Sequence, residues 1–292
     1  IKVPSIRGLS GDIRLNITWK TKRAEVWCDR GHVVAWDQLT VKSARPKKNQ
    51  VSKKRFETLN IEPQLSLFRA SIDNDGFKLL PNLAWVETTT LKRWQQQGID
   101  GDVSQLVKNQ VKRVVRPDGS ERFEHEIVIP KTLDDLPRIG VSFPLPEGFT
   151  EISWWGNGPH ECYPDRQSSA MMGIFSGQAD ELPYLVPQEY GLRTSCRWFE
   201  VSNPKTKEVI RIESDGAELH MSALPYTTQD LYQAADQTEL VKRPYLTMNI
   251  DIAHRGLGTA SCGPDVLPQC RISAGKYQFA YVISRESRGA NR

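Results

Sequence analysis

The sequence predicts an all-β protein built as an antiparallel β-sandwich. Runs that alternate apolar and polar residues, the pattern of half-buried strands, recur along most of the chain. The 20 glycines and 18 prolines fall between these runs, where strands turn. Helical patterns are few. Many short strands with such punctuation indicate a sandwich.

The predicted strands extend over nearly the whole chain. Residues 13–19 alternate apolar and polar side chains, and residues 31–41 form a second strand region. Residues 116–120 (Arg-Pro-Asp-Gly-Ser) predict a hairpin turn, because Pro fixes φ and Gly adopts positive φ. Eight further runs read as strands: residues 105–115, 122–129, 151–155, 196–201, 209–212, 218–223, 245–252 and 276–284.

Two segments predict helices. Residues 84–97 are followed by Gly98, and glycine is favoured just after a helix ends. Residues 228–235 predict a short helix that is opened by a threonine cap. The sequence shows no repeat of fixed period.

Three parts of the chain are predicted. Residues 1–41 supply only about two or three strands, too few for a core, and are expected to be the tail of a preceding domain. Residues 42–60 form a basic linker or a truncated segment, and residues 61–288 form the main domain.

The basic character of the chain is confined to residues 42–55. This segment holds seven Lys and Arg and no acid, whereas the whole chain carries a net charge of only +4. A solvated linker and a tether for a polyanion both fit it. The segment lacks the interleaved aromatic residues of nucleic-acid-binding segments, and we expect no nucleic-acid partner.

Composition excludes several classes of protein. Of the 292 residues, 38% are hydrophobic and 25% charged, which is typical of globular proteins and not of disordered ones. No run approaches the roughly 18 apolar residues of a membrane span, so we expect no membrane association. Residues 1–20 show no signal-peptide pattern. Five cysteines without a Cys-x-x-Cys pair indicate free thiols in a reducing compartment, and a cytoplasmic location is expected.

The first polar cluster is residues 69–76 (Arg-Ala-Ser-Ile-Asp-Asn-Asp-Gly). Three consecutive Asx residues before a glycine predict a tight loop, because Asx side chains bond their own backbone. Such a loop fits either a structural turn or a contact with a ligand or another domain. The spacing of a calcium-binding loop is absent.

The second cluster is residues 154–166 (Trp-Trp-Gly-Asn-Gly-Pro-His-Glu-Cys-Tyr-Pro-Asp-Arg). Aromatic and charged side chains on a closely approaching backbone are typical of sugar sites. A network of Arg and carboxylates that braces a loop has the same composition, so both interpretations stay open. Neither pattern of a phosphate-binding glycine loop is present.

These clusters resemble the C-terminal, small-chain domain of β-galactosidases of glycoside hydrolase family 2. Residues 69–75 resemble the family signature Arg-Ala-Pro-Thr-Asp-Asn-Asp, and residues 156–166 match Gly-x-Gly-Pro-x-Glu-x-Tyr-x-Asp-Arg. Residues 187–193 match the motif Pro-x-x-x-Gly-x-Arg, and residues 256–264 match Gly-x-Gly…Pro. Residues 273–277 resemble the start of the last strand. The four motifs occur in the family's order.

The resemblance implies a galactose-mutarotase-like β-sandwich, with residues 13–41 resembling the end of the immunoglobulin-like domain before it. In this family the small-chain domain leans over a catalytic (β/α)₈ barrel. That barrel supplies both carboxylates for retaining hydrolysis of terminal β-galactosides such as lactose, with the carboxyl groups about 5–5.5 Å apart. The resemblance therefore implies no catalytic residue in this chain, and the isolated chain is expected to be inactive.

Partners and cofactors are implied in the same way. The expected partners are a barrel domain or large subunit, a galactoside, and further subunits of a homo- or hetero-oligomer. The chain itself is expected to hold no cofactor and no dedicated metal, with Mg²⁺ and Na⁺ bound only with the catalytic domain.

The resemblance also assigns roles to residues. The residues expected in the sugar-pocket wall or its mobile loop are Asp73, Asn74, Asp75, Gly76, His160 and Cys262. The loop is expected to run from Gly76 to about Pro81, because glycine tolerates the φ/ψ changes of a hinge. The residues expected to support the motifs are Arg69, Gly156, Gly158, Pro159, Glu161, Tyr163, Asp165, Arg166, Gly191 and Arg193.

The sequence departs from the family pattern in three places. Cys262 stands where the best-known members have a Trp that stacks on the sugar. A thiol lacks that flat platform, so we expect changed glucose affinity or transglycosylation, unless Cys262 is only a small buried thiol. Ser71 and Ile72 replace Pro and Thr, and residues 42–60 stand in place of several strands.

Two other functions remain open. The aromatic and charged cluster at residues 154–166 also fits a non-catalytic carbohydrate-binding module of the same fold. A sugar epimerase needs a positioned His and Glu as acid and base. No such pair is recognisable among the five histidines, of which His160 ranks first for pocket contact because it lies inside a family motif.

Overall fold

The computed structural model describes residues 5–9, 11–43, 54–78, 89–181 and 184–287. The chain divides into two compact units, residues 1–47 and 48–292. In the first unit, β1 (Ile13–Lys20) and β2 (Val33–Lys42) occur where the sequence predicts strands, and the two pair antiparallel as a hairpin. Trp19 and Trp27 are exposed, because two strands alone enclose no core.

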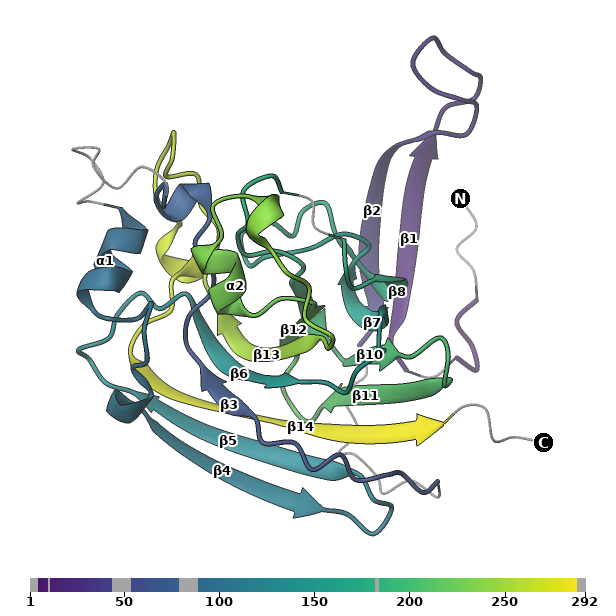
Figure 1. Cartoon of the computed structure of the whole chain (residues 1–292). Coiled ribbons are helices and arrows are strands. Elements are labelled where there is room, and N and C mark those ends of the chain that lie inside the picture. The colour runs from purple at the N-terminus through teal and green to yellow at the C-terminus, as the bar shows by residue number, and fades with distance from the viewer. Residues whose placement is uncertain (1–4, 10, 44–53, 79–88, 182–183, 288–292) are drawn as a thin grey trace. The chain divides into compact units, whose positions relative to one another are not determined.

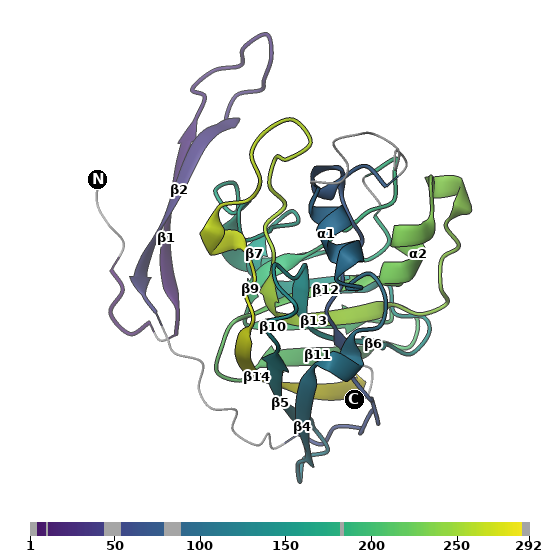
Figure 2. The ribbon, with the colours of Figure 1, turned by 90° about the vertical axis from the view of Figure 1, so that its left-hand side faces the viewer.

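The second unit is a sandwich of two antiparallel sheets (Figures 1 and 2). One sheet has seven strands in the order β4-β5-β14-β11-β10-β7-β8. In chain order these are β4 (Lys108–Val115), β5 (Glu121–Ile129), β7 (Glu151–Gly158), β8 (Met171–Gln178), β10 (Trp198–Ser202), β11 (Glu208–Ser214) and β14 (Gly275–Ser287).

The other sheet has five strands in the order β3-β6-β13-β12-β9. In chain order these are β3 (Gln64–Ser66), β6 (Arg138–Pro144), β9 (Arg193–Cys196), β12 (Leu219–Leu224) and β13 (Thr247–His254). All strand pairs that join these five strands are antiparallel.

The hydrophobic core lies between the two sheets. Along β5 every second side chain is buried, so Phe123, His125 and Ile127 point into the core, while Glu124 and Glu126 are more exposed. Val141 and Ile250 from the five-stranded sheet are fully buried in the same cluster. Burial of apolar surface, at roughly 25 cal/mol per Å², supplies most of the stabilisation that opposes chain entropy.

The antiparallel β-sandwich that the sequence predicts is confirmed, and each predicted strand run overlaps a strand. The sequence pattern does not predict β3, β6, β8 and β9. Strand β8 is an edge strand interrupted by glycines, and β9 has four residues, with Ser195 at a positive φ of 55°. Neither therefore shows the clean alternation by which strands are recognised.

Both predicted helices are present and shorter than predicted. Helix α1 (Thr90–Gln96) begins after Thr89, whose side chain accepts the Lys92 N–H, and residues 84–88 lie outside the described residues. Helix α2 (Thr228–Gln233) is capped by Thr227. Four 3₁₀ turns complete the described structure: η1 (Asp73–Asp75), η3 (Ser104–Leu106), η4 (Gln237–Glu239) and η5 (Pro268–Cys270).

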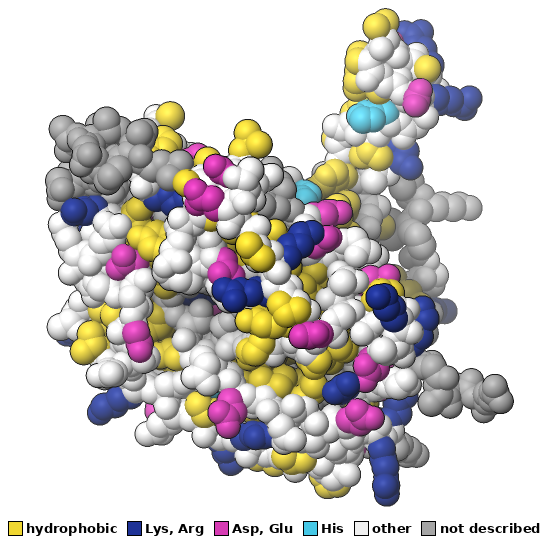
Figure 3. Space-filling view, viewed as in Figure 1, with side chains coloured by type: hydrophobic (Ala, Val, Ile, Leu, Met, Phe, Trp, Pro, Cys, Tyr) yellow, Lys and Arg dark blue, Asp and Glu magenta, His cyan; other side chains and the backbone are white. Residues whose placement is uncertain are grey.

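The described end of the basic segment, residues 54–60, contacts the seven-stranded sheet. The Phe56 N–H donates to the Asp118 carbonyl at 2.6 Å, and the Glu121 carboxylate accepts the Leu59 and Asn60 N–H groups at 2.8 and 3.1 Å. On the face shown in Figure 3, Lys and Arg side chains are interspersed with Asp and Glu.

Candidate functional site

The Asp-Asn-Asp motif forms η1, and a buried ion pair holds this turn in place. The Arg69 guanidinium donates to both Asp75 carboxylate oxygens, at 2.6 and 3.0 Å, and both side chains are fully buried. Asp75 also accepts the Ile72 N–H at 2.9 Å. This buried, bidentate ion pair holds the turn in place, and the Asp75 carboxylate is not exposed to a ligand.

Asn74 connects this turn to the loop of residues 256–266, which we call the glycine loop. Its side-chain N–H₂ donates to the Gly258 carbonyl at 2.6 Å, and its carbonyl oxygen accepts the Ser261 hydroxyl at 2.6 Å. Asp73, the first residue of the turn, is exposed. Two motifs that are far apart in sequence therefore form one rim.

A small cavity of about 100 Å³ opens at this rim. Its described walls come from η1, the start of α1 and the glycine loop. The lining residues are Asp73, Asn74, Gly76, Thr89, Thr90, Arg93, Ala260, Ser261 and Asp265. Hydroxyl, amide and carboxylate groups thus converge on a space that suits a polar ligand group.

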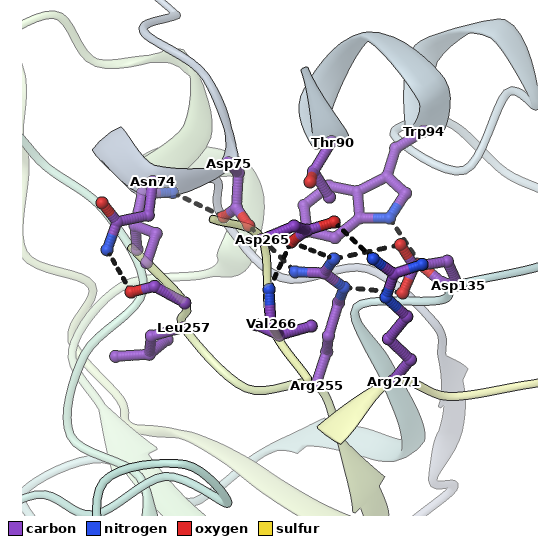
Figure 4. A network of polar contacts seen from close by, with 12 residues as sticks. Asn74, Asp75, Thr90, Trp94, Asp135, Arg255, Leu257, Asp265, Val266 and Arg271 are labelled. Atoms are coloured by element: carbon purple, nitrogen blue, oxygen red, sulfur yellow. Dashed lines mark hydrogen bonds and ion pairs between the residues drawn. The ribbon is translucent and has the colours of Figure 1, made fainter. Parts of the chain in front are cut away.

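An ionic network fastens the glycine loop to the rest of the domain (Figure 4). Arg255 is 1% exposed and donates to Asp135 at 2.7 and 3.0 Å and to Asp265 at 2.8 Å. Arg93 of α1 and Arg271 donate to the same Asp265 at 3.1 and 3.0 Å. Burial alone would raise the pKa of Asp265, but the adjacent Arg255 lowers it, so this carboxylate stays ionised.

Gly76 is placed as the resemblance implies, directly after the Asp-Asn-Asp turn. Its φ of +137° disfavours any other residue, and a Cβ there would lie 2.8 Å from the Thr89 hydroxyl oxygen. Residues 79–88, including Pro81 of the expected mobile loop, lie outside the described residues. Mobility of that loop stays a prediction.

Lys78, two residues later, is anchored by an unusual set of acceptors. Its ammonium donates to the carbonyl oxygens of Pro187, Leu231, Tyr232 and Ala234, at 2.8, 2.8, 3.1 and 2.7 Å. Burial lowers the pKa of Lys78 to about 8, so the side chain is mainly charged at neutral pH. The Lys78 ammonium therefore places a positive charge at the centre of four backbone carbonyl oxygens.

The Gly-Pro motif of residues 156–166 supports the glycine loop from another side. The two carboxylate oxygens of Asp165 accept the N–H groups of Leu257 and Gly258 at 2.9 and 2.7 Å. Gly256 permits this approach, since a Cβ there would lie 2.7 Å from the Asp165 carboxyl carbon. Asp165 is therefore a supporting residue in the structure, and its carboxylate is occupied by backbone groups.

The same motif is also joined to residues 187–193. Glu161 accepts the Gly191 N–H at 2.7 Å and the Tyr184 hydroxyl, and Cys162 donates its N–H to the Leu192 carbonyl at 2.8 Å. The Arg193 guanidinium lies over the Trp154 ring, 4.5 Å from its centroid. Tyr163 is fully buried, whereas Pro159 and Arg166 are exposed.

The structure does not bring all of the predicted pocket residues together. Asp73, Asn74 and Gly76 line the small cavity, whereas Cys262 is exposed in the glycine loop and is not among the lining residues. His160 instead lines a second, larger cavity of about 750 Å³, and its Nε2 lies 2.9 Å from the Ser169 hydroxyl.

Sequence reasoning misses the residues of the ionic network. Asp135 and Asp265 belong to no motif, and Arg255 is marked only by its place before the glycine loop. Lys78 likewise carries no signal, because its acceptors are backbone carbonyls from distant segments. No pattern of residue types could have identified these four residues.

Within the described ranges, no group of three or more His, Cys, Asp or Glu side chains is placed to hold a metal ion. None of the described helices is long and apolar enough to cross a membrane.

Comparison with known proteins gives a consistent result. Residues 38–283 match the family model of the β-galactosidase small chain. A β-galactosidase of Arthrobacter sp. (strain B7) is 28% identical over 329 residues, covering 90% of this chain and 32% of that protein. A β-galactosidase of Vibrio cholerae is 34% identical over 169 residues, covering 57% of this chain and 16% of that protein.

The chain therefore spans a third or less of the length of these relatives. Among solved structures, a GalM/aldose epimerase homologue from C. elegans has a TM-score of 0.33 and 11% identity, covering 62% of this chain and 60% of that one. That similarity is too low to inform the function.

Proposed function

The chain belongs to the β-galactosidase small-chain family, and on this premise we propose that it forms the C-terminal portion of a β-galactosidase of glycoside hydrolase family 2. In this proposal the whole protein hydrolyses terminal β-galactosides such as lactose with retention of configuration. The catalytic carboxylates lie on a barrel domain or large subunit outside this chain. The chain contributes a wall of the sugar pocket and is inactive alone.

The observation that carries the proposal is the rim formed by Asn74 and the glycine loop. The Asn74 side chain donates to the Gly258 carbonyl and accepts from the Ser261 hydroxyl. These two hydrogen bonds join η1 and the glycine loop into one surface. Arg69, Asp165 and Arg255 brace that surface from behind. Such bracing gives a binding wall a fixed shape, which lowers the entropy lost when a sugar docks.

The proposal also covers metal binding, cellular location and oligomeric state. Mg²⁺ and Na⁺ bind with the catalytic portion, and this chain holds no dedicated metal of its own. The protein acts in the cytoplasm as a homo- or hetero-oligomer. The five free cysteines are compatible with a reducing compartment.

The test is kinetic and uses the natural protein that contains this chain. Asn74→Ala removes both links to the glycine loop, and we expect kcat/KM for o-nitrophenyl β-D-galactoside to fall about 10-fold, mainly through KM. Asn16→Ala is the control, because Asn16 makes a single exposed hydrogen bond to Gln38 in the hairpin. Equal kinetics for the parent and Asn74→Ala would contradict the proposed wall.

A further inference from the structure

A buried pair of ionisable side chains lies at the base of the glycine loop. His254 ends β13 and is followed by Arg255 and the loop, and Glu189 belongs to the motif of residues 187–193. The His254 Nε2 lies 3.7 Å from the Glu189 Oε1, and the two residues are 4% and 5% exposed. The function proposed above uses neither side chain.

The contacts of the His254 ring determine how many protons it carries. Its Nδ1 lies 2.9 Å from the Arg255 carbonyl oxygen, and because a carbonyl only accepts, Nδ1 is protonated. The Nε2 has no hydrogen-bond partner within the described part of the chain, and Glu189 is its charged neighbour. An unprotonated Nε2 would place its lone pair beside a carboxylate oxygen, whereas a protonated one completes an ion pair. The geometry therefore favours the doubly protonated imidazolium.

The neighbouring charges favour the same state. Arg138, which pairs with His254 across β6 and β13, donates to both oxygens of Asp251 at 3.1 and 2.6 Å. That pair is neutral in itself, so Glu189 depends on His254 for its counter-charge. Burial alone would raise the pKa of Glu189, but the adjacent His254 and Arg138 lower it, so the carboxylate stays ionised.

The other ionisable groups near the pair supply no alternative counter-charge. Tyr163, whose ring centroid lies 5.4 Å from that of His254, stays neutral because burial raises its pKa. Burial, with a smaller effect of His254, lowers the pKa of His220 to about 4, so His220 is neutral at pH 6 and above. Arg69 and Arg255 are charged, but each already donates to the aspartates described above.

The end of β13 has few other attachments. Strand β12 pairs with β13 only as far as Asp251, so residues 252–254 pair with β6 alone, after an irregular register between Asp251 and Ala253. The ion pair connects this end to Glu189, which lies outside both sheets. Loss of the Nε2 proton would leave a buried carboxylate without its partner, a costly state that separation of the two segments relieves.

We propose that the charge of His254 controls how firmly the base of the glycine loop is held. As an imidazolium, His254 joins this base to Glu189, and as the pH rises and the proton leaves, that link is lost and the loop loosens. His254 is a positioning residue, because it is buried and acts through the loop. Only the effect on sugar binding rests on the proposed function.

The first readout is the protonation state of His254 in the 292-residue chain, measured at pH 6 from the ¹⁵N NMR shifts of the imidazole. Nuclear Overhauser effects to the Tyr163 ring identify its signal. We expect an imidazolium in the parent and in the exposed control Glu181→Gln. Glu189→Gln keeps the size but removes the charge, and should leave the ring neutral, as burial keeps His220. A neutral ring in the parent, or an imidazolium in Glu189→Gln, would overturn the proposal.

The second readout is hydrogen–deuterium exchange of residues 256–266 in the natural protein that contains this chain, corrected for the intrinsic effect of pH. Protection in the parent should fall at least tenfold between pH 6 and pH 9, and Glu189→Gln should show the lower protection at both pH values. Unchanged protection in the parent, or equal protection of parent and variant at pH 6, would also overturn the proposal.

A kinetic comparison separates this proposal from the proposed function. At pH 6, Glu189→Gln should raise KM for o-nitrophenyl β-D-galactoside at least threefold relative to Glu181→Gln, with similar kcat. If exchange in the loop increases while KM stays the same, the loop is not a wall of the sugar pocket. That result would contradict the proposed function and would still support the role of His254 in holding the loop.

Discussion

Asn74 and Gly258 are 184 positions apart in sequence, and a 2.6 Å hydrogen bond joins the side-chain amide of the first to the carbonyl of the second. The Ser261 hydroxyl completes the contact by donating to the Asn74 side-chain oxygen. The Asp-Asn-Asp motif and the glycine loop thus form one structural unit.

The Arg69–Asp75 pair is expected to be essential for stability. Arg69→Met removes the bidentate partner of the buried Asp75 carboxylate, which keeps only the Ile72 N–H and the more distant Arg255 at 3.9 Å, so the free energy of unfolding should fall by about 3–5 kcal/mol. Urea unfolding followed by fluorescence measures the change. Lys242→Ala, which removes one exposed partner of Asp180, should cost less than about 1 kcal/mol, and losses of equal size in the two variants would refute the argument.

Lys78 is expected to stabilise the segment after the Asp-Asn-Asp motif by satisfying four carbonyl oxygens. Lys78→Met keeps the length of the side chain but removes the charge and its donors, and should lower the free energy of unfolding by about 2 kcal/mol. Urea unfolding of the parent and the variant measures the loss, and equal free energies of unfolding would contradict this expectation.

His125 is expected to make the protein less stable in mild acid. Burial lowers the pKa of His125 from 6.5 to about 4, so the folded state keeps it neutral while the unfolded chain takes up a proton below pH 6.5. Its contribution to stability is therefore complete above pH 6.5. It is lost as the pH falls toward 4, at up to about 1.4 kcal/mol per pH unit.

The variant His125→Phe isolates this effect, because a phenyl ring can keep the stacking on Phe279 at 4.9 Å. Chemical unfolding between pH 7 and 4 should show a shallower decline for the variant than for the parent. His220, whose pKa burial also lowers to about 4, should maintain a residual decline. Parallel pH profiles of the parent and His125→Phe would show that His125 is not the group responsible.

Cys262 is expected to influence glucose binding and the fraction of transglycosylation. The side chain is exposed in the glycine loop, so Cys262→Trp should be tolerated and should restore an aromatic platform. In the natural protein we expect tighter glucose binding and a larger fraction of transglycosylation products from lactose. Chromatography of the products measures that fraction, and an unchanged product ratio would argue against a role for this position in acceptor binding.

The fold is predictable where strands have one buried face. Strand β5 alternates so regularly that its limits are almost those of the predicted run. The glycine-interrupted edge strand β8 and the four-residue β9 lack such a pattern, because neighbouring strands and not their own composition hold them. The threonine cap expected for the second helix is present, whereas the first helix begins at Thr90, and its cap Thr89 lies inside the predicted helical run.

The site is predictable only where a motif names its residues. The turn at Asp73–Asp75 and its glycine occur where the sequence places them. Arg255 and Asp135 are 120 positions apart, and as isolated charged residues they resemble any surface residue. His160 and Asn74 line different cavities. Which cavity a residue lines depends on the tertiary arrangement of distant segments, and a local sequence pattern does not encode that arrangement.

The most direct test compares o-nitrophenyl β-D-galactoside hydrolysis by the natural protein and by the 292-residue chain, together with the intact mass of the natural protein. We predict hydrolysis by a natural protein or complex well above 33.2 kDa and none by the chain alone. Hydrolysis by the purified 292-residue chain would contradict the claim that the catalytic carboxylates lie outside it.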